Sequence, residues 1–438
     1  MDATTLPRPG DLTSIDPDEV VDAYDARGLD RLSDAALVAR CAAIVDRPKQ
    51  APPDSFVLHA PLELMARAAL LGRVTPAARL LARQRLVWFA ATYAAAGPTV
   101  ADPAPVGFAE PRDAVRALGD AIGAGDMDRA DGTADWLATN TGVLDLVGAL
   151  VDVVTPSLAG AAHGGIFLHQ VLSFAGAPGA PAVPGARAFT RELARNPDWR
   201  LSWYADAVLG HREGGAGQAA PGALAEAVRR PPSPGPLDSN SIYPTMHLTE
   251  SSGLAAELLG PALDGVDRSA AATALLRMAA LSMLQDDPAE APYGWSHCLT
   301  MPHGLLAVAP VASRPDHALA VAATYVLGFR ATQGTVDVDP GWVPEPVVAR
   351  GDAVAALEGT PDEAAAAAWH AGADEDGMVA AALVSYAATH PDAHLVKYTL
   401  ACQQQAVSDP AFAHGYMAAA AYLGAWWRQH PVTDDPLL

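Results

Sequence analysis

Histidines recur in one local setting along this chain, and imidazole is a side chain that binds metals and transfers protons. Five segments begin with a histidine that opens an otherwise apolar helical stretch; these histidines are His59, His163, His247, His297 and His394. A single histidine on an apolar face is more often a hydrogen-bonded core residue than a ligand. Five in the same setting favour a shared metal centre to which several helices each contribute one imidazole.

Two of these segments carry a second histidine six residues further on. His163 is followed by His169, and His297 by His303. Six residues turn an α-helix by roughly 240°, so the second imidazole lies on another face. We therefore expect only one histidine of each pair to reach the metal, and in the first pair we assign His163. His297 remains a candidate ligand or catalytic residue, with Pro302 interrupting the helix before His303.

Lysine is rare in this chain, which makes its positions informative. Of 28 basic residues only Lys49 and Lys397 are lysines, and Lys49 lies in Arg-Pro-Lys-Gln, a pattern typical of an exposed turn. Lys397 lies in an apolar helical stretch three residues after His394, so both side chains share a helix face. Burial favours the neutral amine, which can capture CO2 as a carbamate and so become an anionic oxygen ligand. The alternative is a lysine that snorkels or pairs with Asp392.

The elements that position these residues are expected to be helices. The chain has 438 residues, of which 50% are hydrophobic and 6% aromatic, and it is rich in alanine, leucine and valine. This composition favours packed helices over a β-sandwich. We predict a mainly α fold with a single domain over 1–438. Residues 1–20 are expected to be flexible, and the Gly/Pro-rich stretches 175–187 and 211–240 to be loop insertions.

Composition also excludes several classes of function. A net charge of -22 repels phosphate backbones and anionic lipids, so neither nucleic acid nor a membrane is an expected partner. The N-terminal stretch lacks the apolar segment of a signal peptide, which predicts a cytoplasmic protein. Three widely spaced cysteines suggest neither a disulfide framework nor a thiolate zinc site. No phosphate-binding glycine motif indicates a built-in nucleotide site, and the oligomeric state is not indicated.

Several of the histidine segments resemble motifs of the questin oxidase-like family. His394-Leu-Val-Lys-Tyr-Thr-Leu-Ala resembles the His-Val-Ile-Lys-x-Thr-x-Ala signature near the C-terminus of that family. The segments Leu58-His59-Ala-Pro, Ala-Ala-His163-Gly-Gly-Ile-Phe and Met-His247-Leu-Thr are similar to three further motifs. The matches follow the family order from about residue 55 to 425. Glu63, and Gly164 with Gly165, depart from the family pattern.

The resemblance implies oxygen-dependent oxidation of an aromatic polyketide such as an anthraquinone, by ring cleavage or a Baeyer–Villiger-type opening. It implies a mononuclear non-haem Fe(II) centre with four histidines and a carboxylated lysine, and in some members NADPH as an external reductant. Carried over by position, the ligands are His59, His163, His394 and carboxylated Lys397, with His247 or His297 as the fourth imidazole. The substrate and O2 are then the expected partners.

Aromatic residues near these segments can stack flat rings, although ordinary core packing is the commoner role of any one of them. The candidate pocket walls are Phe167, Trp203, Tyr204, Trp295 and Tyr398. Two other functions compete with the oxygenase. A carboxylated lysine with histidines also builds zinc hydrolase centres, although the Asp ligand and HxH pair usual there are absent from the pattern. The second alternative is a non-catalytic helical protein.

Overall fold

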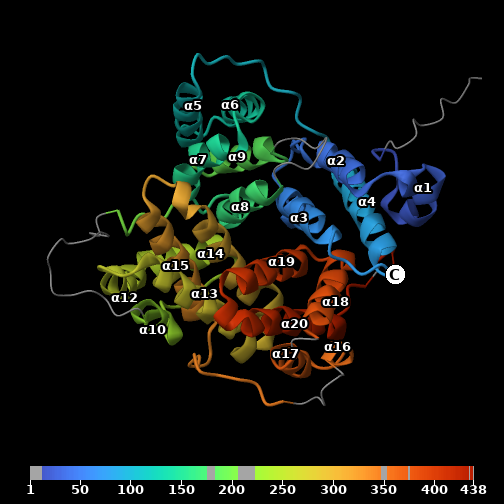
Figure 1. The fold of residues 1–438 in the computed structure, drawn as a ribbon. Coiled ribbons are helices and arrows are strands. Elements are labelled where there is room, and N and C mark those ends of the chain that lie inside the picture. Colours follow the sequence, from blue (N-terminus) through green and yellow to red (C-terminus); the bar gives the residue numbers. More distant parts are fainter. Residues whose placement is uncertain are drawn as a thin grey trace, which may run out of the picture.

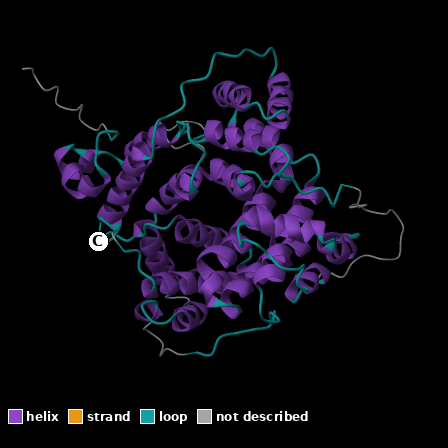
Figure 2. Cartoon of the chain, turned by 180° about the vertical axis from the view of Figure 1, so that it is seen from behind, coloured by secondary structure: helices purple, strands orange, loops and turns teal. Residues whose placement is uncertain are grey.

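The chain folds into a mainly α-helical domain, as the composition predicts. The computed structural model describes residues 12–174, 183–205, 222–346, 353–372, 375–433 and 435–437. Within these ranges the chain forms helices α1–α20 and no β-strand (Figures 1 and 2). Their buried apolar side chains form one cluster that extends from Leu12 to Ala425. Residues 1–11 and 175–182, and the first part of the second predicted insertion, 211–221, lie outside the described residues.

The N-terminal helices form one side of the domain, where α4 packs against α1, α2 and α3. A turn that contains Pro76 separates α3 from α4. Proline lacks the N–H that a continuing helix needs, and it disfavours helical geometry at the residue before it. The helices of this side are α1 (Val20–Ala26), α2 (Asp34–Val45), α3 (Ser55–Leu71) and α4 (Arg79–Ala95).

The next group lies to the upper left of α3 in Figure 1, apart from α8, which lies beside α3 and contacts it. In this group α6 contacts α5 and α9, while α7 packs on α8. Arg187 connects two of these helices, because its guanidinium donates to the buried carboxylate of Asp131 at 2.6 Å. The helices are α5 (Pro111–Gly123), α6 (Met127–Asn140), α7 (Val143–Val154), α8 (Gly164–Phe174) and α9 (Ala186–Arg195).

The third group surrounds the long helix α15, which contacts α10, α11, α12, α13 and α14. The short helix α10 lies within the predicted 211–240 insertion. The other described residues of this insertion form a loop. A single turn of π-helix, η5 (Ala291–Trp295), leads directly into α14. The helices are α10 (Ala223–Arg229), α11 (Ile242–Ser251), α12 (Leu254–Leu263), α13 (Arg268–Gln285), α14 (Ser296–Val308) and α15 (Pro315–Gln333).

The C-terminal helices close the domain opposite α5 and α6 (Figure 1). Helix α20 packs against α13, α17, α18 and α19, so the end of the chain is fixed to its middle. The carboxylate of Asp435 accepts from Arg85 of α4, and both side chains are buried. The helices are α16 (Ala353–Ala356), α17 (Pro361–Trp369), α18 (Asp376–Thr389), α19 (Ala393–Ser408) and α20 (Ala413–Gln429).

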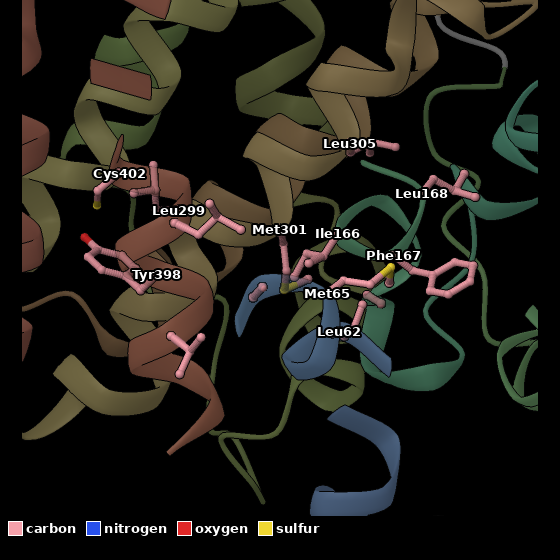
Figure 3. Close-up of a cluster of buried hydrophobic side chains, with 14 of the residues drawn as sticks. Leu62, Met65, Ile166, Phe167, Leu168, Leu299, Met301, Leu305, Tyr398 and Cys402 are labelled. Carbon is pink, nitrogen blue, oxygen red and sulfur yellow. The ribbon is translucent and has the colours of Figure 1, made fainter. Parts of the chain in front are cut away.

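Four helices from distant parts of the chain form a closed circuit at the centre. Helix α3 contacts α8, α8 contacts α14, α14 contacts α19, and α19 contacts α3. Figure 3 shows apolar side chains filling the space among them, including Met65, Ile166, Met301 and Leu299. The circuit brings together four of the segments that the sequence singled out.

Helices α8 and α14 approach each other unusually closely because glycines meet at their crossing. A Cβ atom on Gly304 would lie 2.6 Å from the backbone of Ile166, and one on Gly165 would lie 2.7 Å from the backbone nitrogen of Leu305. A Cβ on Gly164 would lie 2.4 Å from Val154 of α7. Only glycine permits these contacts, which accounts for the paired glycines after His163.

No helix among the described residues combines the length and apolar character needed to cross a membrane. The three cysteines, Cys41, Cys298 and Cys402, are free and buried.

Candidate metal centre

Four imidazoles meet inside the central circuit: three come from α3, α14 and α19, and the fourth from the residue that immediately precedes α8. We call His59, His163, His297 and His394 the four-histidine cluster. Successive rings stand nearly perpendicular: the centroids of His59 and His163 are 4.7 Å apart at 80°, and those of His163 and His297 are 5.1 Å apart at 88°. His394 closes the square, 4.9 Å from His297 and 4.8 Å from His59.

The ring nitrogens that point into this square are Nε2 atoms. Nε2 of His163 lies 3.1 Å from Nε2 of His59 and 3.2 Å from Nε2 of His297. One ligand nitrogen each of His59, His297 and His394 lies within 4.8 Å of the other two. Two imidazoles on opposite sides of one ion span about 4.2 Å. A contraction of roughly half an ångström would therefore place the nitrogens of His59, His297 and His394 around a single ion. His163 is not part of that group of three and would have to move closer to His394 to bind the same ion.

Hydrogen bonds on the outer side of the cluster fix the tautomers. Nδ1 of His59 donates to the Ser55 carbonyl at 2.6 Å, Nδ1 of His163 to the Gly160 carbonyl at 3.1 Å, and Nδ1 of His297 to the Tyr293 carbonyl at 2.7 Å. A carbonyl oxygen can only accept, so each of these Nδ1 atoms carries the proton. Burial lowers the pKa of all three imidazoles well below the ordinary value, so they are neutral.

It follows that the inward Nε2 atoms of His59, His163 and His297 carry lone pairs and no proton. Lone pairs that face one another at 3.1–3.2 Å repel instead of forming hydrogen bonds. Nε2 of His394 is also buried and has no hydrogen-bond partner among the described residues. A cation at the centre of the square would satisfy all four nitrogens. Outer hydrogen bonds to carbonyls and carboxylates are the usual support of metal-bound histidines.

Three of the four histidines stand where helices begin. His163 immediately precedes α8, and His297 and His394 are the second residues of α14 and α19. The chain reaches His163 through left-handed backbone at Gly160, Ala161 and Ala162, and the two alanines, with φ of 52° and 54°, are strained there. Helices α8 and α19 begin at the cluster, where the partial positive charge of a helix N-terminus favours an anion, and the Asp392 carboxylate already occupies this position on α19. Helix α14, in contrast, continues directly from η5.

Lys397 is buried beside the cluster, one turn after His394 on α19. Its side chain is 2% exposed, and its Nζ has no hydrogen-bond partner among the described residues. Burial, opposed by Asp392 and Glu63, lowers the pKa of this amine to about 7. After burial, the charge on Lys397 is the largest influence that lowers the pKa of His59 and of His163. Of the two alternatives for this lysine, the structure has the buried amine, and the Nζ atom has no ion-pair or hydrogen-bond partner within the described ranges.

Asp392 supports the cluster instead of neutralising the lysine. Its carboxylate accepts from the backbone N–H groups of His394 and Leu395 at 2.8 and 3.1 Å, which caps α19. The other oxygen lies 3.4 Å from Nδ1 of His394. Asp392 therefore orients the fourth imidazole in the way that backbone carbonyls orient the other three.

Glu63 is part of a buried support for the same region. Nε of Arg67 donates to the Glu63 carboxylate at 2.8 Å. The same guanidinium donates to the carbonyls of Ala388 at 2.9 Å and His390 at 2.7 Å. This ion pair joins α3 to the segment that leads into α19, so it positions His394 relative to His59.

The structure decides between the two alternatives for the fourth imidazole. His247 is exposed on α11, where it stacks on Tyr243 with the ring planes 7° apart. His297, by contrast, is 1% exposed and takes part in the cluster. The assignment of His247 as a ligand is therefore wrong. His247 shares the apolar helical setting of the others, but its helix turns this side chain outward.

The predicted pocket aromatics are dispersed, and only one of them lines a cleft at the cluster. Phe167 follows His163 by one turn and stacks on Phe189 at 4.5 Å. Trp203 and Tyr204 lie elsewhere, because the Trp203 indole donates to Thr324 at 3.0 Å and Tyr204 packs against His317. These two belong to a separate cleft or to core packing.

The remaining two aromatics serve the core. Trp295 is fully buried, and its indole N–H donates to the Asp287 carbonyl at 3.0 Å. Tyr398 is also fully buried, and Figure 3 shows it beside Leu299 and Cys402 in the apolar cluster. Tyr293 was not predicted, yet its ring lies 4.6 Å from that of His297 and its carbonyl holds Nδ1. The π-helical turn that contains it was not visible in the helical periodicity.

The prediction of an exposed turn at Lys49 is also wrong. It is 7% exposed instead of lying in an exposed turn, and its Nζ donates to the carbonyls of Ala94 and Gly97 at 3.2 and 2.9 Å. These carbonyls end α4, where a cation is favourable. Lys49 also lines a narrow cleft of about 40 Å³ that reaches His163 and is walled by Pro61, Phe167 and Phe189.

No protein-family model, curated protein or solved structure matches this chain. The function must therefore be argued from the residues of the cluster and from the cleft that leads to it.

Proposed function

We propose that the chain is an oxygenase that uses a single non-haem Fe(II) ion to oxidise an aromatic polyketide. The ion would be held by the four-histidine cluster and a carboxylated Lys397. The observation that carries this proposal is the convergence of unprotonated, unpartnered Nε2 atoms in a buried site. Imidazole nitrogens with an anionic oxygen suit iron, and when bound the ion supplies redox chemistry with O2.

Lys397 supports the proposal because a neutral buried amine is a nucleophile. Its nitrogen forms a bond to the carbon of CO2, one C=O electron pair becomes the carboxylate charge, and a proton leaves the nitrogen. The resulting carbamate would supply an anionic oxygen ligand to an ion in the four-histidine cluster. An arginine at this position would stay charged and could not react in this way.

The cleft at His163 is the route that we propose for O2 and for the substrate. A volume of about 40 Å³ has room for O2 or a water molecule. A three-ring aromatic needs several times that volume, so the side chains that line the cleft must move when it binds. The stacked pair of Phe167 and Phe189 offers a flat apolar wall to such a ring. Lys49 also lines this cleft, whereas the guanidinium groups of Arg191 and Arg195 are already paired with carboxylates.

The oxygen balance separates the two oxidative outcomes. A dioxygenase places both atoms of O2 in the product and needs no external reductant. A monooxygenase places one atom in the product and one in water, with two electrons from a donor such as NADPH. Isotopically labelled O2, supplied with and without NADPH to the protein and an anthraquinone, distinguishes these two reactions by mass spectrometry.

The first test is the metal itself. We expect aerobically purified protein to contain one iron per chain, with an anomalous peak at the iron edge among the four Nε2 atoms. Zinc in place of iron would favour the hydrolase alternative, and a protein without metal would contradict both. The free, buried thiols agree with a reducing, cytoplasmic location, which is part of the same proposal.

The carbamate is tested by substitution of Lys397. We expect Lys397→Ala to lose iron and turnover, with partial recovery when a short carboxylate such as acetate is added. Lys397→Arg is the matched control, because it keeps a long basic side chain but cannot form a carbamate, and it should be as inactive as the alanine variant. Normal iron content and turnover in either variant would defeat the role given to Lys397.

A further inference from the structure

A second pair of histidines lies on two of the helices that carry the four-histidine cluster. His169 follows His163 by six residues on α8, and His303 follows His297 by six residues on α14. Their ring centroids are 4.9 Å apart with the planes at 84°. Adjacent rings of the cluster lie 4.7 Å apart at 80° and 5.1 Å apart at 88°. The His169–His303 pair thus repeats the arrangement of two neighbouring cluster imidazoles.

The two Nε2 atoms of this pair converge on one point. Oε1 of Gln404 lies there, 3.1 Å from Nε2 of His169 and 3.0 Å from Nε2 of His303. Gln404 lies on α19, which also carries His394. The same three helices therefore supply two imidazole nitrogens and an amide oxygen, and each of these atom types is a metal ligand.

A neighbouring glutamine supports His303 from behind. The side-chain amide of Gln405 lies 2.6 Å from Nδ1 of His303. Without an ion, Nε2 of each histidine carries the proton and donates to Oε1 of Gln404. Binding of an ion moves these protons to the Nδ1 atoms, and rotation of the Gln405 amide by half a turn presents its oxygen to accept from Nδ1 of His303. This is the outer hydrogen bond that metal-bound imidazoles usually make. A small rotation of Gln404 would open the point between the two Nε2 atoms or keep its oxygen as a third ligand.

The pair differs from the cluster in its access to solvent. It lies in a cleft of about 480 Å³, whose lining includes Arg73, Leu306 and Ser408. His169 and Gln404 are half-buried, whereas His303 is buried. Burial lowers the pKa of His303 to about 3 and also lowers that of His169, so both imidazoles are neutral at pH 7. An ion could enter and leave here without opening the fold.

We propose that His169 and His303, with Gln404, form a second, exchangeable site for a divalent transition-metal ion of the Ni²⁺, Cu²⁺ and Zn²⁺ class. Nε2 of each histidine and Oε1 of Gln404 bind the ion, and water completes its coordination. Mg²⁺ and Ca²⁺ prefer oxygen ligands and are excluded by the two nitrogens. This site does not depend on the oxygenase proposal, because it lies at other residues and opens to a different cleft.

The test is a calorimetric titration of Zn²⁺ into the full chain, purified with whatever metal its buried centre retains through gel filtration. We expect one additional Zn²⁺ per chain, removable by a mild chelator. His169→Ala should weaken this binding at least about tenfold, since it removes a half-buried ligand with little disturbance of the core. The matched control is His414→Ala, which removes an exposed histidine on α20 and should leave the titration unchanged.

Crystals soaked in Zn²⁺ supply an independent readout that needs no variant. An anomalous peak between the two Nε2 atoms of the pair supports the site. Absence of that peak, absence of saturable uptake, or equal binding by His169→Ala and the wild type would each overturn it. None of these outcomes bears on iron in the four-histidine cluster, so failure of one proposal is distinguishable from failure of the other.

Discussion

The four-histidine cluster and the His169–His303 pair share helices α8, α14 and α19, yet their imidazoles are in opposite chemical situations. In the cluster the outer Nδ1 atoms donate to protein oxygens, and the inner Nε2 atoms face one another without protons. In the pair the inner Nε2 atoms already have Gln404 as a partner. The first arrangement is incomplete without a cation, whereas the second is stable without one and can accept one.

The difference teaches that ring geometry alone does not identify a tightly bound metal. The ring-to-ring distances and angles of the two sites are nearly the same. What differs is the supply of protein hydrogen bonds to the inward nitrogens, and with it the free energy of leaving the site without an ion. We therefore expect tight retention in the cluster and rapid exchange in the pair.

The substitution with the largest expected effect, Gly304→Val, should disrupt both metal sites. A Cβ on Gly304 would lie 2.6 Å from the Ile166 backbone, so Gly304→Val forces α8 and α14 apart. We expect about 3 kcal/mol of lost stability by urea unfolding, together with loss of iron and of exchangeable zinc. Gly119→Ala is the control, because nothing lies within 4 Å of its Cβ position on α5, and it should stabilise by up to about 1 kcal/mol. Wild-type stability and metal content in Gly304→Val would refute the close crossing.

The substitution with the next largest expected effect, His297→Gln, should disrupt the four-histidine cluster and leave the His169–His303 pair intact. His297→Gln removes a buried inward nitrogen, and we expect the affinity for the metal to fall by more than the roughly 100-fold that loss of a supporting hydrogen bond can cost, so that the metal is lost during gel filtration. His247→Gln changes an exposed histidine and should retain the metal fully. Metal analysis after gel filtration measures both variants. The reverse pattern would restore His247 as the fourth ligand.

Acid sensitivity sharpens the comparison, because burial lowers the pKa of His59, His163 and His297 in the cluster and of both histidines in the pair. Burial lowers the pKa of His303 to about 3, while the unfolded chain takes up that proton below pH 6.5. The stability from keeping His303 neutral is thus complete above pH 6.5 and is lost as the pH falls toward 3. The maximal slope is about 1.4 kcal/mol per pH unit for one histidine.

The measurement is the free energy of unfolding of metal-free protein between pH 7.5 and 4.5. His303→Gln should reduce the slope of the unfolding free energy against pH by the contribution of about one proton. The buried histidines of the cluster should account for a further part of that slope. An unchanged slope in His303→Gln would show that this imidazole is protonated in the folded chain.

The smallest effect concerns the turn before His163. Ala161 has φ of 52°, which costs an L-residue about 1 kcal/mol or somewhat more. Ala161→Gly removes this strain, but it also makes the unfolded chain more flexible, so we expect a net gain below about 1 kcal/mol and unchanged metal content. In contrast, Ala138→Gly within α6 should lose up to about 1 kcal/mol. Thermal melting compares the two variants; destabilisation by Ala161→Gly would contradict the strained turn.

Much of this architecture could be read from the residues. Composition and periodicity predicted a mainly α domain, and the six-residue spacing correctly separated His169 and His303 from the cluster. The scarcity of lysine pointed to Lys397, which is buried beside His394. These inferences succeeded because they rest on local properties, namely helix geometry and the cost of burying a charge.

The errors have a common physical origin in tertiary packing. His247 lies in the same local sequence pattern as the four cluster histidines. However, helices far away in sequence decide which face of α11 is covered. Lys49 lies in a turn by its local sequence, yet it reaches the carbonyls that end α4. Trp203 and Tyr204 were grouped with the centre by residue type alone. Local patterns do not contain the information that decides any of these cases.

The circuit of α3, α8, α14 and α19 also has a consequence for the order of assembly. Its four imidazoles come from widely separated stretches, and the last of them, on α19, is synthesised near the end of the chain. A bound ion would hold four distant stretches together and would so close three long loops of the chain. The entropy cost of closing these loops opposes metal binding until most of the domain is folded. Metal loading should therefore be a late event in biogenesis, and a nascent chain that ends before α19 should hold no ion.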